Sequence, residues 1–273
     1  MRSGKALLAA GAACLFSSAA FGADMPSLAP PPNYGPPLAE DLEGWYLRGD
    51  IGFSNQRVSR LETPGYHDPG ITVAPTIGLG FDAAGIAGLG AGYQFNNWFR
   101  TDLTGEYRGR SNMHGLDIVR FNGAVIGADS YNASKSEWLL LANAYVDLGT
   151  WWCVTPFVGA GLGLSRNTIS SFLDINTPNR GVAYAPAASR WDLAWALHAG
   201  LAYRLSTGLT LELAYRYVSL GDGETGAVTN FQGFSRGRTV EFKDITSHDA
   251  KIGIRWELDS PPVYDPPALI RKG

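Results

Sequence analysis

The sequence has little cysteine and no long apolar run after its first 22 residues. Only Cys14 and Cys153 occur in 273 residues. Cys14 lies in a segment that we expect to be removed, so a disulfide within the mature chain is excluded. A membrane-spanning helix needs about 20 apolar residues, and neither such a stretch nor long helical periodicity is present. We therefore expect an all-β chain whose fold is closed without disulfides.

The N-terminal segment has the anatomy of a secretory signal peptide. Two basic residues precede a short apolar run, and Ala20 and Gly22 are the small residues that a cleavage site requires. We predict a signal peptide over residues 1–22. Lipoprotein acylation at Cys14 is the weaker alternative, because Gly11 stands where a leucine is usual.

Proline is concentrated at the two ends of the mature chain, and acidic residues outnumber basic ones. Residues 23–43 contain six prolines and residues 259–273 contain four, which predicts an extended linker and a similar tail. Removing the signal peptide leaves a net charge of about −5. Nucleic-acid binding is therefore not expected.

Eight segments between residues 44 and 258 alternate apolar and polar side chains with a period of two, as half-buried β-strands do. Each is long enough to cross a bilayer at a tilt, which takes about 9–11 residues. The segments are 44–54, 85–95, 99–108, 136–149, 156–165, 191–205, 209–218 and 248–258. Leu139 and Leu141 break the alternation of the fourth.

The connections alternate between short turns and long polar loops. The long ones are residues 55–84, 109–135, 166–190 and 221–247. Outer-membrane barrels have short periplasmic turns and longer extracellular loops. With an even number of strands, both termini are expected in the periplasm.

Two closed barrels fit this pattern, a soluble lipocalin-like barrel with the apolar row inside and a membrane barrel with that row outside. The polar row mixes glycine with long charged residues, which suits the filled interior of a barrel of about eight strands. Large aromatic residues gather near both ends of the apolar row, as they do at lipid interfaces. We predict a closed eight-stranded antiparallel transmembrane β-barrel over residues 44–258.

The charges of the polar row nearly balance, and buried charges are tolerated when they are paired. We predict an ion-pair network in the lumen. Its members are Arg48, Asp50, Arg100, Asp102, Glu106, Arg108, Asp147, Arg204, Glu212, Arg216, Lys251, Arg255 and Glu257, with Glu137, Asp192 and Asp249 in the same row.

The sequence resembles a known family in GWYLRGDIGFS, GYQFNNWFRTDLTGEYR, LANAYVDLG followed by TPFVGAGLG, and HDAKIGIRWEL. These runs are similar to the OmpA-like, opacity-type barrels that are major surface antigens of alphaproteobacteria. The resemblance implies a Gram-negative outer-membrane protein that contacts lipid and lipopolysaccharide, supports envelope integrity and meets host or surface ligands. One departure is that fifteen residues follow Leu258, where such barrels commonly end on an aromatic residue. Ala23, at the start of the linker, also resembles alanines joined covalently to peptidoglycan, although a passive linker is slightly favoured.

Catalytic and cofactor chemistry is weakly supported. Ser247, His248 and Asp249 are adjacent, and neighbours on a strand face opposite sides, so they cannot form a triad among themselves. His198 is expected as a satisfied interior residue, and His67 and His114 as ordinary loop histidines. The glycines of residues 88–92 and 159–163 have strand spacing rather than that of a phosphate-binding loop. No cofactor is expected.

We therefore predict a structural barrel, not an enzyme, that supports the envelope and presents four long loops outward. A small channel, with the ion pairs lining a water path, is the first alternative. A barrel enzyme acting on lipid or peptide is the second.

Overall fold

The computed structural model describes residues 43–62, 69–73, 77–178 and 180–258. The expected signal peptide at 1–22, the linker up to residue 42 with Ala23, the tail at 259–273 and His67 lie outside these residues. No helix in the described part is long and apolar enough to span a membrane.

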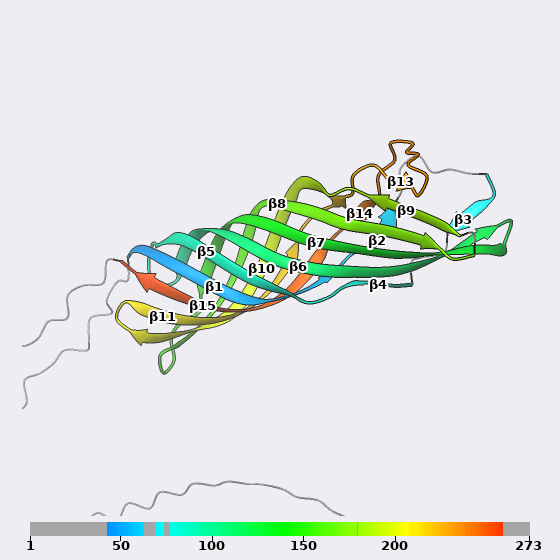
Figure 1. The fold of residues 1–273 in the computed structure, drawn as a ribbon. Helices are drawn as coiled ribbons and strands as arrows, with labels where there is room; N and C mark the ends of the chain where they lie inside the picture. The colour runs from blue at the N-terminus through cyan, green and yellow to red at the C-terminus, as the bar shows by residue number, and fades with distance from the viewer. Residues whose placement is uncertain (1–42, 63–68, 74–76, 179, 259–273) are drawn as a thin grey trace, which may run out of the picture. The chain divides into compact units, whose positions relative to one another are not determined.

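Eight strands form a closed antiparallel ring, which confirms the predicted fold (Figure 1). Each strand pairs with its neighbour along the ring, and the pairing of β10 with β8 completes the circle. The strands are β1 (Gly44–Arg57), β5 (Ala84–Gln94), β6 (Phe99–Phe121), β7 (Ala124–Asp147), β8 (Val154–Asn176), β10 (Ala188–Ser206), β11 (Leu209–Ser219) and β15 (Thr246–Glu257).

The predicted ends of three strands were wrong, because β6, β7 and β8 run 23 or 24 residues and extend far past the ring at the loop side (Figure 1). Most of the expected loop 109–135 is therefore a β-hairpin. Its turn uses Asn122 and Gly123 with positive φ angles of 48° and 85°, the conformation that matches the twist of a two-residue hairpin.

Seven short strands fill the remaining loop segments. β3 and β4 pair with β6, β9 pairs with β8, β13 pairs with β9, and β12, β14 and β2 form a separate three-stranded sheet. Their bounds are β2 (Arg60–Glu62), β3 (Ile71–Val73), β4 (Ile77–Phe81), β9 (Gly181–Ala185), β12 (Gly223–Glu224), β13 (Thr229–Asn230) and β14 (Glu241–Lys243).

The apolar row of the ring faces outward, as a membrane barrel requires. Leu89, Leu162 and Leu193 are 74%, 72% and 75% exposed. Trp45 and Trp256 are exposed at the short-turn end, and Phe53, Tyr107 and Trp138 are exposed toward the loops. This arrangement excludes the soluble barrel with an apolar interior, and it matches the aromatic girdles of a lipid-facing surface.

The loop side of the barrel encloses an apolar cluster. Leu139 and Leu141, which broke the alternation of their segment, point inward and are 0% and 1% exposed. They join residues from the loops, including Leu220, Phe242 and Ile245, which are completely buried. We call this set the mouth cluster. Its other buried members are Val58, Phe81, Met113, Ala133, Ile169, Phe172, Ala185, Ala194, Ala196, Val218 and Val240.

Candidate functional site

The membrane-spanning part of the barrel is filled by charged side chains on the inward positions of its strands. Seven basic and eight acidic residues take part, and all but Glu257 are less than 9% exposed. We call this set the lumen network. Its members are Arg48, Asp50, Arg100, Asp102, Glu106, Arg108, Lys135, Glu137, Asp147, Glu212, Arg216, Asp249, Lys251, Arg255 and Glu257.

Glu212 is the centre of the half that lies nearer the short turns. Its carboxylate lies 3.2 Å from Arg48, 3.0 Å from Arg100 and 3.3 Å from Arg255. These partners come from β1, β6 and β15, while Glu212 is on β11, so the contacts cross the lumen. Arg48 also donates to Asp50 at 2.9 Å and to Asp102 at 2.8 Å. Because Glu212 binds arginines of three other strands, side chains from opposite sides of the ring meet in this part of the lumen.

Arg216 is the centre of the half that lies nearer the loops. Its two terminal nitrogens donate to both oxygens of Glu106 at 2.9 and 2.5 Å. Its Nε donates to Asp249 at 2.9 Å. Arg108 binds the same Asp249 in bidentate fashion at 3.0 and 2.6 Å. Lys251 joins the two halves, since it lies 2.5 Å from Glu106 and 3.4 Å from Asp50.

Aromatic rings share the lumen with these charges. The guanidinium of Arg100 lies 4.4 Å from the ring centre of Tyr145 and 4.8 Å from that of Phe157, within the range of cation–π attraction. The hydroxyl of Tyr46 lies 3.2 Å from Asp102. Tyrosines therefore provide both apolar packing and polar partners inside the barrel.

Inward glycines leave space for these large side chains. A Cβ on Gly92 would lie 2.3 Å from Tyr46, and one on Gly159 would lie 2.5 Å from Tyr145. A Cβ on Gly253 would lie 2.3 Å from Asp50. Most of the inward glycines face aromatic rings, amides and carboxylates, and Gly90 faces an arginine, since its Cβ would lie 3.1 Å from Arg48.

Two charged residues of the predicted row are placed differently. Arg204 has an inward register position opposite Thr210, but it lies next to an irregularity at the short-turn end of β10 and is exposed. It therefore does not belong to the lumen network. Asp192 accepts hydrogen bonds from the backbone amides of Leu193 and Asp222. Its carboxylate therefore anchors the loop that follows β11 and does not join the lumen network.

The sequence interpretation missed Lys135, Tyr46 and Tyr145. Lys135 was assigned to a loop, yet it is 1% exposed, pairs with Glu137 and donates to Gln56 at 2.9 Å. Its position two residues before Glu137 on the same alternating run was the signal that could have identified it. Tyr46 and Tyr145 lie on the polar rows of their strands in the alternating pattern, but only charged residues were assigned to the predicted network.

Among the histidines that the structure describes, none forms a catalytic arrangement, and neither does the Ser-His-Asp run. The hydroxyl of Ser247 donates to Asp249 inside the barrel at 2.6 Å, whereas His248 lies outside against Tyr215 at 2.6 Å. His198 is 8% exposed in the lumen and lies 3.1 Å from Asn143. Within the described residues, no group of three His, Cys, Asp or Glu side chains is placed to hold a metal ion.

A closed ring of eight antiparallel strands with a lipid-facing apolar surface defines a transmembrane barrel of the outer-membrane type. The chain belongs to the outer membrane protein beta-barrel domain family, whose model matches residues 8–256. It is accordingly a protein of the Gram-negative outer membrane.

Relatives and solved structures of similar kind are known. An uncharacterized protein of Brucella abortus is 31% identical, with 88% of this chain and 93% of that protein covered. The "Putative adhesin" of Rickettsia bellii is 28% identical, with 79% and 89% covered. The outer membrane protein OprG of Pseudomonas aeruginosa has 16% identity and a TM-score of 0.44, with 79% and 97% covered.

Proposed function

We propose that this protein is a sealed, non-enzymatic outer-membrane barrel that reinforces the envelope and presents its long loops to surface or host ligands. The observation that carries the proposal is the double closure of the interior, by the lumen network in the membrane and by the mouth cluster under the loops. A filled interior argues against transport. The relative named as an adhesin supports surface binding.

The closure is tested by conductance. Purified protein reconstituted in a planar bilayer is expected to give no steady openings, because the proposed double closure leaves no continuous water path. Steady single-channel openings from pure protein would favour the small-channel alternative. A variant with a disrupted mouth cluster, in which Leu139 and Phe242 are both replaced by serine, tests whether the lumen network alone is sufficient to prevent conductance.

The loop turn around β13 is the sharpest candidate for surface binding. The amide of Phe234 donates to the side chain of Asn230 at 2.8 Å, and this turn leaves Phe231 and Phe234 71% and 62% exposed. Exposed apolar side chains on a defined turn can form the centre of an interface. We expect Phe231→Ser with Phe234→Ser to reduce attachment of expressing cells to cultured epithelial cells.

Trp152 offers a matched control for this experiment. It is 97% exposed but lies in the short turn between β7 and β8, on the opposite end of the barrel. Trp152→Ser should leave attachment unchanged at equal surface amounts. Equal attachment by the wild type and the double phenylalanine variant would show that this turn does not mediate surface binding.

The envelope role is tested in a strain that lacks the gene. We expect increased sensitivity to detergent, restored by the full chain and by a version whose β6–β7 hairpin is shortened. Because His114 and Asn132 are cross-strand partners, residues 115–131 can be replaced by Asn-Gly without changing the register. Failure of the shortened version to restore resistance would show that the β6–β7 hairpin, and not the barrel alone, is needed for the envelope role.

Attachment of the Ala23 amine to peptidoglycan is a further part of this proposal. Mass spectrometry of digested cell walls would detect a muropeptide on Ala23. Deletion of residues 26–40 separates tethering from loop presentation, because it shortens the linker and leaves the loops intact.

A further inference from the structure

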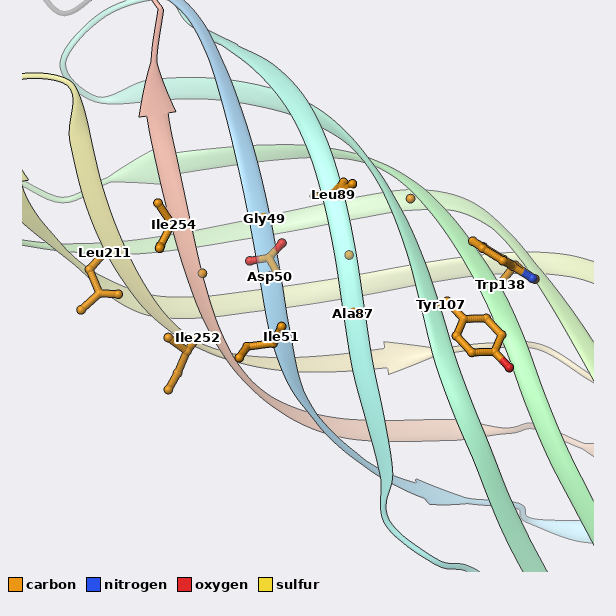
Figure 2. Close-up of a pocket in the computed structure, with 13 residues that line it drawn as sticks. Gly49, Asp50, Ile51, Ala87, Leu89, Tyr107, Trp138, Leu211, Ile252 and Ile254 are labelled. Atoms are coloured by element: carbon orange, nitrogen blue, oxygen red, sulfur yellow. The ribbon is translucent and has the colours of Figure 1, made fainter.

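A groove runs over the outward surface of β1, β5, β6 and β15, on the lipid-facing side of the barrel (Figure 2). Its volume is about 580 Å³, within the range of about 300–1,000 Å³ typical of small-molecule sites. Gly49, Ala87 and Gly105 form its floor, because none of them carries more than a methyl group. Large side chains surround the floor, namely Ile51, Leu89, Tyr107, Trp138, Leu211, Ile252 and Ile254.

The groove reaches from the middle of the membrane to the loop-side aromatic girdle. In the row nearer the middle of the membrane, Gly49 pairs with Leu89, which pairs with Gly105. In the next row toward the loops, Ala87 pairs with Tyr107, which pairs with Trp138. The rings of Tyr107 and Trp138 lie 5.0 Å apart and mark the outer interface. The groove therefore faces the outer leaflet.

The groove stays open on its loop side. Gly85 and Gly109 follow Ala87 and Tyr107 toward the loops, and a Cβ on Gly85 would meet no atom within 4 Å. A Cβ on Gly109 would lie 3.6 Å from the carbonyl oxygen of Gly85. A bound hydrocarbon chain can thus extend from the floor toward the loops without meeting a side chain at these two positions.

Arg110 places a positive charge at the loop-side end of the groove. Arg110 is exposed and follows Tyr107 by three residues on β6, about 10 Å along a strand that rises about 3.3 Å per residue. Among the described residues, its guanidinium has no ion-pair partner. The nearby Asp82 is instead within 3.4 Å of the side-chain amide of Asn112. An unpaired guanidinium above an apolar groove suits a phosphate above an acyl chain.

We propose that this groove binds an acylated, phosphorylated glycolipid of the outer leaflet, namely the lipid A part of lipopolysaccharide. One acyl chain lies over Gly49, Ala87 and Gly105, and Arg110 contacts a phosphate of the headgroup. Arg57, exposed at the loop end of β1, provides a second cation on the same side. This site depends on the membrane orientation of the barrel and not on the proposed loop interactions.

Native mass spectrometry of the folded full-length protein in detergent tests the site with lipid A as the probe. Gly105→Leu fills the floor, and its Cβ would only reach Leu140 at 3.4 Å, so the fold should tolerate it. We expect this variant to bind lipid A about tenfold more weakly, the change that corresponds to about 1.4 kcal/mol. Ala160→Leu, at another outward position, is the matched control and should bind as the wild type does.

Arg110→Gln separates headgroup recognition from acyl-chain packing. It should weaken binding of phosphorylated lipid A about tenfold and leave binding of dephosphorylated lipid A unchanged. Arg180→Gln, at an exposed loop arginine, is the control for net charge. Wild-type affinity in Gly105→Leu, or equal weakening of both lipids by Arg110→Gln, would overturn the proposal. So would conversion of a dimer to a monomer by Gly105→Leu with unchanged lipid binding, because the groove would then hold a second copy.

Discussion

Two layers of inward-facing side chains fill this barrel, and they use opposite chemistry. In the membrane the interior is ionic and the exterior apolar, whereas under the loops the interior holds the apolar mouth cluster and polar side chains take exterior positions on the strands. On β6, Leu103 faces lipid and Arg108 faces the lumen, but farther along Met113 is completely buried while Asn112 and His114 are exposed. The inversion follows the solvent, since the outer surface meets hydrocarbon in one region and water in the other.

A β-bulge produces this inversion on β6. The register with β7 shifts between Arg108 and Ser111, and one extra residue in a strand turns the following side chains to the other face. Odd-numbered apolar residues therefore face lipid before the bulge and the interior after it. A similar irregularity on β8 uses Ser171 with a positive φ of 53°.

Removal of one cation from the lumen network should have the largest effect on the free energy of unfolding. Arg216→Met removes the bidentate partner of Glu106 and one of the two arginines that bind Asp249, and breaking a buried ion pair typically costs about 3–5 kcal/mol. The free energy of unfolding, measured by urea titration in lipid vesicles, should fall by this amount. A loss below about 1 kcal/mol would show that the ionic layer is hydrated and not packed.

A cavity in the mouth cluster should cost slightly less. Leu139→Ala removes a buried side chain, for which losses of about 2–5 kcal/mol are typical. The neighbouring Leu140 faces outward and is 45% exposed, so Leu140→Ala is the matched control and lipid can fill the space it leaves. The same urea titration compares the two variants, and equal losses would contradict the proposed difference between the layers.

The hairpins above the membrane should respond to pH, with a smaller effect. Burial, with the nearby carboxylates of Asp129 and Asp117, raises the pKa of Asp174 to about 7. The unfolded value is about 4, so the folded state binds this proton more tightly. Stability is therefore present at low pH and lost as pH rises through about 4 to 7.

Hydrogen exchange of β8, corrected for the intrinsic rate, should show more frequent opening at pH 8 than at pH 5. Burial also raises the pKa of Asp129, so Asp174→Asn should reduce this pH dependence and Asp174→Asn with Asp129→Asn should remove it, while Asp82→Asn, at an exposed position, should retain it. A pH dependence of unchanged size in Asp174→Asn would assign it to another group.

The smallest effect is expected at Arg204. Because this residue is exposed at the end of its strand, Arg204→Met should change the free energy of unfolding by less than about 0.5 kcal/mol. Measured beside Arg216→Met, this variant contrasts an exposed arginine with a buried one on the same alternating pattern. A loss as large as that of Arg216→Met would place Arg204 in the lumen network.

Sequence alone determined the strand count, the face of the ring that meets lipid and most members of the lumen network. Alternation with a period of two is a local property, and charges such as those of Arg48 and Glu212 can be tolerated only on the filled side. It also located the three short turns, because turn residues interrupt the pattern.

Tertiary structure decided which charges pair, where the ionic layer ends and what closes the mouth. The partners of Glu212 come from three other strands and meet only when the ring closes. Leu139 broke the alternation in the sequence, yet it belongs to the same buried cluster as loop residues more than 80 positions away, such as Phe242. The bulge that reverses the faces of β6 adds one residue without changing the spacing of apolar residues, so only the strand pairing reveals it.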